Sequence, residues 1–112
     1  MKHVFKLPEE YTFEKEDIRG TNFESKELSN KAKFAVIETE SGHKNRIREN
    51  ECDFFYYVLD GSGNFEINGE IEECEKGNLI VIPSDSIFKY TGKMKLFLTT
   101  IPFWYSEQED VL

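Results

Sequence analysis

Short runs with a period of two in their side-chain pattern recur along this chain, and that period is typical of β-strands. The runs are rich in aromatic and β-branched residues, which strands favour. They cover residues 33–37, 54–59, 79–82, 87–91 and 95–101. No segment carries a long helical stripe, and only residues 22–30 could form a helical turn. Short strands separated by frequent turns predict an all-β sandwich or barrel.

Two turns and two strands carry a more specific signal. The Asn68-Gly69 pair favours a type I′ hairpin between the strands on either side of it. Gly61-Ser62-Gly63 predicts a further turn. In two of the runs the alternation is imperfect, since residues 54–59 and 79–82 are apolar at nearly every position. We therefore expect both faces of these two strands to be covered, in the centre of a sheet.

Length and charge limit the partners of the chain. Its 112 residues are the length of a single domain. With 14 basic and 22 acidic side chains its formal net charge is −8, so we expect neither a nucleic acid nor a membrane as partner. The first residues lack the apolar region of a signal peptide, which predicts a cytoplasmic location. Cys52 and Cys74 are then expected to be free thiols.

Residues 42–61 resemble the first conserved motif of the cupin family. That motif reads Gly, five residues, His-x-His, three or four residues, Glu, six residues, Gly. The chain keeps this spacing from Gly42 to Gly61. The metal-binding positions, however, hold Arg48, Asn50 and Phe54.

Residues 77–92 are similar to the second cupin motif, which reads Gly, five residues, Pro-x-Gly, two residues, His, three residues, Asn. Gly77 and Pro83 are retained, whereas Phe88 stands in place of the histidine. The short distance between the two motifs is typical of small members of the family. The chain thus resembles a small single-domain cupin in which the metal-ligand positions have been replaced.

The resemblance implies a jelly-roll β-barrel over residues 31–112, preceded by strands or an arm in residues 1–30, within one domain. It also implies a homodimer, because cupins commonly pair and the apolar positions of residues 1–30 have no core of their own. The metal-dependent activities of cupins are not carried over, since an arginine repels a cation and a phenylalanine has no lone pair. We expect no metal and no cofactor, and a metal-dependent oxygenase is the least favoured function.

The motif positions of cupins face the interior of the barrel, and alternation adds two tyrosines to the same face. The candidate ligand-binding residues are therefore Arg48, Asn50, Phe54, Tyr56, Phe88 and Tyr90. These side chains either fill the barrel or line a pocket, and the sequence leaves both open. An arginine inside a barrel needs an anion, which could be a ligand or an internal carboxylate such as Glu51 or Asp53.

The leading functional prediction is a metal-free small cupin that binds a small anionic or sugar-like molecule without catalysis. The alternative is a metal-independent sugar isomerase or epimerase. Cupins of that kind use a histidine base and a tyrosine acid, and Tyr56, Tyr90 or Tyr105 could supply the acid. The nearby histidine, His43, is expected in a surface loop, so no catalytic residue is assigned. The aromatic tail at residues 102–105 is expected to close the open end of the barrel.

Overall fold

The computed structural model of the chain describes residues 3–15, 17–43, 45–104 and 109–111. Within these ranges the chain forms ten antiparallel strands and no helix, which confirms the all-β prediction. The strands are β1 (Phe13–Lys15), β2 (Ile18–Asn22), β3 (Lys33–Thr39), β4 (Ile47–Glu49), β5 (Asp53–Ile67), β6 (Glu70–Glu75), β7 (Leu79–Ile82), β8 (Ile87–Thr91), β9 (Met94–Ile101) and β10 (Glu109–Val111). None of the described residues belongs to a helix with the length and apolar character needed to cross a membrane.

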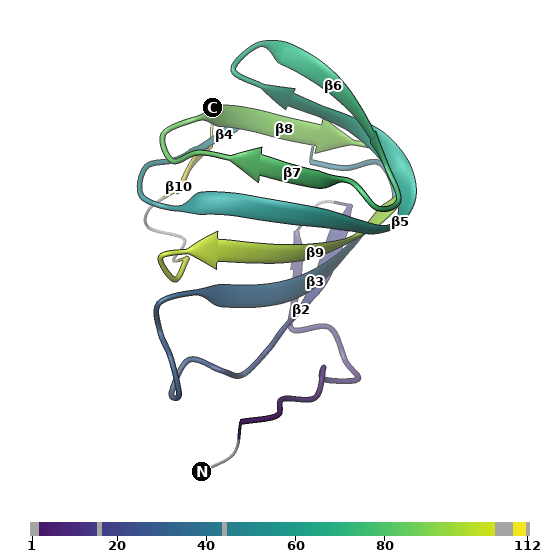
Figure 1. Cartoon of the computed structure of the whole chain (residues 1–112). Helices are drawn as coiled ribbons and strands as arrows, with labels where there is room; N and C mark the ends of the chain where they lie inside the picture. The colour runs from purple at the N-terminus through teal and green to yellow at the C-terminus, as the bar shows by residue number, and fades with distance from the viewer. Residues whose placement is uncertain (1–2, 16, 44, 105–108, 112) are drawn as a thin grey trace.

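The strands curl into a barrel whose two sheets share β5 (Figure 1). The strand order is β1-β2-β3-β9-β5-β8-β4-β10, and β6 and β7 also pair with β5. The first half of β5 pairs with β9 and β7, and its second half pairs with β6 and β8. A register shift between Val58 and Asp60 marks a bulge before this change of partners, and bulges bend a strand without ending it.

The predicted turn at Gly61-Ser62-Gly63 is wrong, because these residues lie within the continuous strand β5. Gly61 has a φ of 85°, and a Cβ on it would lie 2.2 Å from the carbonyl oxygen of Lys93. Glycine therefore lets β5 bend closely against the chain before β9 while its pairing continues. The Asn68-Gly69 hairpin is confirmed, since both residues have positive φ and connect β5 to β6.

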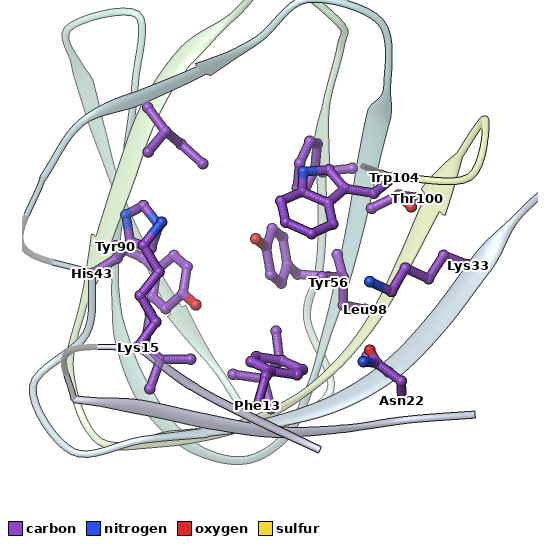
Figure 2. A pocket seen from close by; sticks show the side chains of 15 residues that line it. Phe13, Lys15, Asn22, Lys33, His43, Tyr56, Tyr90, Leu98, Thr100 and Trp104 are labelled. Carbon is purple, nitrogen blue, oxygen red and sulfur yellow. The ribbon is translucent and has the colours of Figure 1, made fainter. Parts of the chain in front are cut away.

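The N-terminal part of the chain extends the sheet. β1 and β2 form a hairpin, and β2 pairs along its whole length with β3. In the predicted helical turn at residues 22–30, the amide of Ser29 donates to the carbonyl of Ser25, which closes a single turn. The hairpin brings Phe13 and Lys15 to one end of the barrel (Figure 2).

The two faces of the β5–β7 pair differ in burial. On the inner face Phe54, Tyr56 and Ile82 are buried. On the outer face Leu79 is 61% exposed and Val81 is 50% exposed. Residues 54–59 are central as predicted, but the expected cover of both their faces is wrong, because Tyr57 is 42% exposed on the outer face. The central position predicted for residues 79–82 is also wrong, because among the described strands β7 pairs only with β5.

Candidate functional site

A cavity of about 260 Å³ opens inside the barrel, between the N-terminal hairpin and the two sheets. Its volume is just below the range of roughly 300–1,000 Å³ that is usual for small-molecule pockets. Most of the lining is apolar, with a few polar groups among aromatic rings. Of the two possibilities that the sequence left open, a filled barrel and a pocket, the structure has the pocket.

Three aromatic side chains with polar atoms lie together on the cavity wall: His43, Tyr90 and Tyr56 (Figure 2). The rings of His43 and Tyr90 are stacked with their centroids 5.3 Å apart. The ring of Tyr56 meets that of Tyr90 edge-on at 5.5 Å. Tyr56 lies on β5 and Tyr90 on β8, so the group joins the two sheets.

His43 reaches the cavity because the chain before β4 runs close to β8. Gly42 forms an isolated β-bridge with Thr91, and the amide of His43 donates to the carbonyl of Tyr90 at 2.8 Å. Gly42 has a φ of 97°, and a Cβ there would lie 2.2 Å from the Tyr90 carbonyl oxygen. The expectation of a surface position for His43 is therefore wrong, since the residue is 9% exposed. The conserved glycine position of the cupin motif was the one sequence signal for this close approach.

A hydrogen bond fixes the tautomer of neutral His43. Its Nδ1 lies 2.8 Å from the backbone carbonyl oxygen of Asn45. A carbonyl can only accept, so Nδ1 carries the proton and donates it. The lone pair of the neutral ring is then on Nε2, which is the arrangement that a general base requires.

Three of the six candidate ligand-binding residues line the cavity: Phe54, Tyr56 and Tyr90. Phe88 is buried behind them, with its ring edge-on to that of Phe54 at 5.2 Å, and it supports the wall without lining it. Period two along β5 and β8 accounts for all four positions, as the sequence analysis expected.

The expected inward orientation of Arg48 and Asn50 is wrong. On β4 the inward positions are Ile47, which lines the cavity, and Glu49, which is buried. The Arg48 side chain is 41% exposed, and its Nε lies 3.7 Å from an oxygen of Asp85. Asn50 is exposed in the bend after β4. A strand of only three residues carries too little alternation to reveal its register, which here depends on pairing with β8 and β10.

Neither Glu51 nor Asp53, the carboxylates expected to pair with Arg48 inside the barrel, has that role in the structure. Glu51 is exposed, and an oxygen of Asp53 accepts the amide of Ser84 at 2.8 Å. The buried carboxylate is Glu49, whose oxygens accept the amides of Glu51 and Cys52 at 2.6 and 2.9 Å. It fixes the bend between β4 and β5 that brings Phe54 into the cavity wall.

A second set of polar side chains, which the sequence analysis did not single out, lines the cavity from the opposite side: Asn22, Lys33 and Thr100 (Figure 2). Burial lowers the pKa of Lys33, because desolvation disfavours its charged form. Its Nζ lies 4.6 Å from the centre of the Trp104 ring, a cation–π distance. Trp104 lines the mouth as part of the predicted aromatic tail, whereas Tyr105 lies outside the described residues.

The two cysteines are buried free thiols. Burial and the neighbouring Glu49 raise the pKa of Cys52 far above its usual range, and its Sγ lies 3.1 Å from the Pro102 carbonyl oxygen. Burial also raises the pKa of Cys74. Neither thiol has the lowered pKa of a nucleophile.

The residues at the cupin metal positions do not fit a metal ion. Phe54 and Phe88 offer no lone pair, and Arg48 and Asn50 are directed away from the cavity. Over the part of the chain that the structure describes, no three His, Cys, Asp or Glu side chains come together in a metal-binding arrangement. The chemistry available to the cavity is that of its histidine, two tyrosines, two lysines, threonine and amide.

Three solved structures with this architecture cover between 79% and 100% of the chain. The Streptomyces protein PAC13, solved with uridine as variants in which a histidine is changed to glutamine or a tyrosine to phenylalanine, has a TM-score of 0.91 and 24% identity over 100% of this chain and 91–92% of its own. KdgF from Halomonas has a TM-score of 0.78 and 13% identity, over 95% of this chain and 99% of its own. The cupin domain of Schizosaccharomyces pombe Cnp3 has a TM-score of 0.68 and 13% identity, over 79% and 66%.

The chain has a cupin fold. This confirms the predicted jelly-roll barrel and the small cupin domain. A further structure, of Pac13 described as a nucleoside dehydratase, has a TM-score of 0.90 and 25% identity over 100% of this chain and 92% of its own. No protein-family model and no curated protein sequence matches the chain. At these identities the cupin likeness is one of fold, and the function has to be argued from the cavity.

Proposed function

We propose that this cupin is a metal-independent enzyme that binds a nucleoside-like molecule in its cavity and eliminates water from it by proton transfer. The observation that carries the proposal is the convergence of His43, Tyr56 and Tyr90 on one cavity wall. A histidine and a tyrosine at one pocket form an acid–base pair that needs no metal.

The PAC13 structures support the same three residues. The histidine and the two tyrosines changed in those uridine-bound variants are each numbered one below His43, Tyr56 and Tyr90, in that order. Pac13 is described as a nucleoside dehydratase. The chain and PAC13 also overlap over their full or nearly full lengths, so a shift of one position is what a shared site would give.

The proposed reaction balances with groups that the cavity contains. Nε2 of His43 takes a proton from a substrate carbon, and the electron pair of that C–H bond forms a C=C bond. The hydroxyl group on the neighbouring carbon leaves with a proton from the phenol of Tyr56 or Tyr90, as water. Proton transfer from the imidazolium through solvent then restores both groups.

The test is binding and turnover by the purified protein and its variants. Titration calorimetry measures uridine binding, and mass spectrometry detects loss of one water from a panel of nucleosides that includes forms oxidised in the sugar. His43→Gln should lower turnover by about 10²–10⁴-fold. Tyr56→Phe tests the acid, and Tyr57→Phe is its matched control, because Tyr57 is on the outer face of the same strand.

Each alternative from the sequence gives a different result. If uridine binds but no nucleoside of the panel is turned over, the result would favour the prediction of a non-catalytic binding protein. Exchange of a carbon-bound proton with deuterated water, without loss of water, would indicate an isomerase or epimerase. Turnover that is unchanged in His43→Gln would contradict the proposed base.

A further inference from the structure

Two buried polar atoms on the far wall of the cavity have no hydrogen-bond partner among the described residues: Oδ1 of Asn22 and Oγ1 of Thr100. Thr100 is 1% exposed, and both residues line the cavity. A buried polar atom without a partner is costly to the folded protein. Groups of this kind in a pocket are therefore candidates for contacts with a ligand.

Lys33 belongs to the same cluster by the register of the sheet. Lys33 and Thr100 are directly opposed on β3 and β9, and Asn22 on β2 opposes Ala35, the next inward residue after Lys33. Opposed side chains lie about 5 Å apart at Cβ and diagonal ones about 7–8 Å apart. Figure 2 shows all three on one side of the cavity, facing His43 and Tyr90 on the other.

The donors and acceptors of this cluster limit what it can bind. Lys33 can only donate, Thr100 can donate or accept, and Oδ1 of Asn22 can only accept. A carboxylate or phosphate offers acceptors alone, so it would leave Oδ1 of Asn22 without a donor and next to negative charge. A ligand edge that has an N–H beside carbonyl oxygens satisfies all three residues.

We infer that Asn22, Lys33 and Thr100 form a recognition subsite for the carbonyl–N–H–carbonyl edge of a uracil-type base. The base N–H donates to Oδ1 of Asn22, and the two ring carbonyls accept from Lys33 and Thr100. This rests on the proposed function, because it assigns the base of the nucleoside to one wall and the reacting sugar to the wall with His43. The small cavity favours a one-ring base over a two-ring purine.

The test compares uridine with ligands that alter this edge, using titration calorimetry on the whole protein. Methylation at N3 of uridine removes the donor, and cytidine has an unprotonated ring nitrogen at that position. Both should bind at least about tenfold more weakly than uridine, the cost of losing one hydrogen bond and leaving a buried acceptor unpaired. Equal affinity for uridine and 3-methyluridine would overturn the inference.

Three near-isosteric variants test the protein side: Asn22→Leu, Lys33→Met and Thr100→Val. Each should weaken uridine binding by about tenfold. Only Asn22→Leu should also reduce the preference for uridine over 3-methyluridine, because Asn22 is the residue that accepts from the base N–H. The matched controls are Thr99→Val and Lys95→Met, which change residues of β9 that do not line the cavity. Both variants should bind uridine as the wild type does.

A thermal melt without ligand separates recognition from a structural role. Asn22→Leu and Thr100→Val remove the two buried oxygens for which the described part of the chain offers no partner, so both variants should melt at the same or a higher temperature than the wild type. A lower melting temperature with unchanged uridine affinity would overturn the inference. So would glucuronate binding that exceeds uridine binding and is lost in Lys33→Met, because it would make the cluster an anion site.

The outcomes distinguish this inference from the proposed function. If uridine binds with the expected preferences but no nucleoside loses water, the subsite stands and the catalytic proposal fails. If turnover depends on His43 but the Asn22 and Lys33 variants bind uridine normally, the subsite fails and the catalytic proposal stands. If no nucleoside binds to the wild type, both are overturned.

Discussion

At the scale of single residues, a few polar side chains determine the shape of the cavity wall. Glu49 is 1% exposed and accepts two backbone amides in the bend after β4. Lys33 places a charged group at the cavity and rests on the ring of Trp104. Glu49 stabilises the fold. Lys33 lowers the stability of the ligand-free fold, and its proposed role is to bind a ligand.

We predict that Glu49→Ala lowers the free energy of unfolding by about 2–3 kcal/mol, because two amides in the bend lose a charged acceptor. Urea denaturation measures the change. Glu51→Ala is the control, since the Glu51 side chain is exposed, and it should change stability by less than about 0.5 kcal/mol. Equal effects of the two substitutions would contradict the role given to Glu49.

We predict that Lys33→Met stabilises the ligand-free protein at neutral pH, because it removes a desolvated charge. Burial lowers the pKa of Lys33 in the folded state below its ordinary value of 10.5. Below the folded pKa the lysine is charged in both states and the full penalty applies. As the pH rises through the folded pKa towards 10.5 the lysine becomes neutral and the penalty disappears. The stability difference between variant and wild type, measured in urea, should therefore shrink from pH 7 to pH 10.5, and a constant difference would contradict this account.

The site residues that could be predicted from the sequence are those whose orientation depends on local alternation. Phe54, Tyr56 and Tyr90 lie on strands long enough for period two to determine which side chains face inward. Arg48 lies on a three-residue strand whose register is determined by distant partners, and the expectation for it failed. The position of His43 depends on a contact with β8 that only Gly42 signalled, and that of Lys33 on pairing with β9, which the apolar run after it does not reveal.

At the scale of elements, connections between strands position the site as much as the strands do. The approach of residues 41–43 to β8 turns the ring of His43 onto Tyr90. The strands themselves were largely predictable, and β7 and β8 have the bounds expected from the sequence. The continuity of β5 through Gly61 and Gly63 could not be predicted, because a bend within a strand and a turn between strands have the same residue composition. Only the pairing partners of the strand distinguish the two.

We predict that Gly42→Ala destabilises the protein more than Gly69→Ala. Both glycines have positive φ, which costs an alanine about 1–2 kcal/mol. A Cβ on Gly42 would also lie 2.2 Å from the Tyr90 carbonyl oxygen, whereas one on Gly69 meets no atom within 4 Å. Gly42→Ala should also lower uridine affinity, because it moves His43. Similar melting temperatures for the two variants would contradict the close approach.

At the scale of the whole molecule, the barrel presents a cavity on the inside and an apolar sheet face on the outside. Inside, Phe54 and Phe88 stand at two of the metal-ligand positions of the cupin motifs, and the outer face carries Leu79, Val81 and Tyr57. The cavity side chains bear on the chemistry of the protein, and the exposed outer face bears on its assembly.

We predict that the purified protein contains no stoichiometric Fe, Mn, Ni or Zn. The reason is the chemistry of Phe54 and Phe88 and the outward direction of Arg48. Elemental analysis measures the content, and a chelator should leave the melting temperature unchanged, because it has no bound metal to remove. About one metal ion per chain, lost together with stability on chelation, would contradict the prediction.

The homodimer expected from the sequence stays a prediction, but its expected basis in the apolar positions of residues 1–30 changes, because Phe13 lines the cavity and Ile18 is buried in the core. We propose instead that the interface is the outer face of β5 and β7. Tyr57 opposes Leu79 and Phe55 opposes Val81 across these strands, which gives a continuous apolar surface. Light scattering after size exclusion should report the mass of two chains. The double variant Leu79→Lys, Val81→Lys should report one chain and keep its uridine affinity, since neither residue lines the cavity. A wild type with the mass of one chain would contradict the dimer.

The strand that passes from one sheet to the other also determines how the protein comes apart. β5 supplies pairing partners to β9 and β7 in its first half and to β6 and β8 in its second. Neither sheet can separate from the barrel while this strand keeps all its hydrogen bonds. We therefore expect the strands that pair with β5 to unfold as one cooperative unit, and the amides at the centre of β5 to exchange with solvent only when that unit opens. By contrast, among the described strands the N-terminal hairpin pairs with the rest of the sheet through β3 only, so we expect it to open at a lower free energy than the centre of β5.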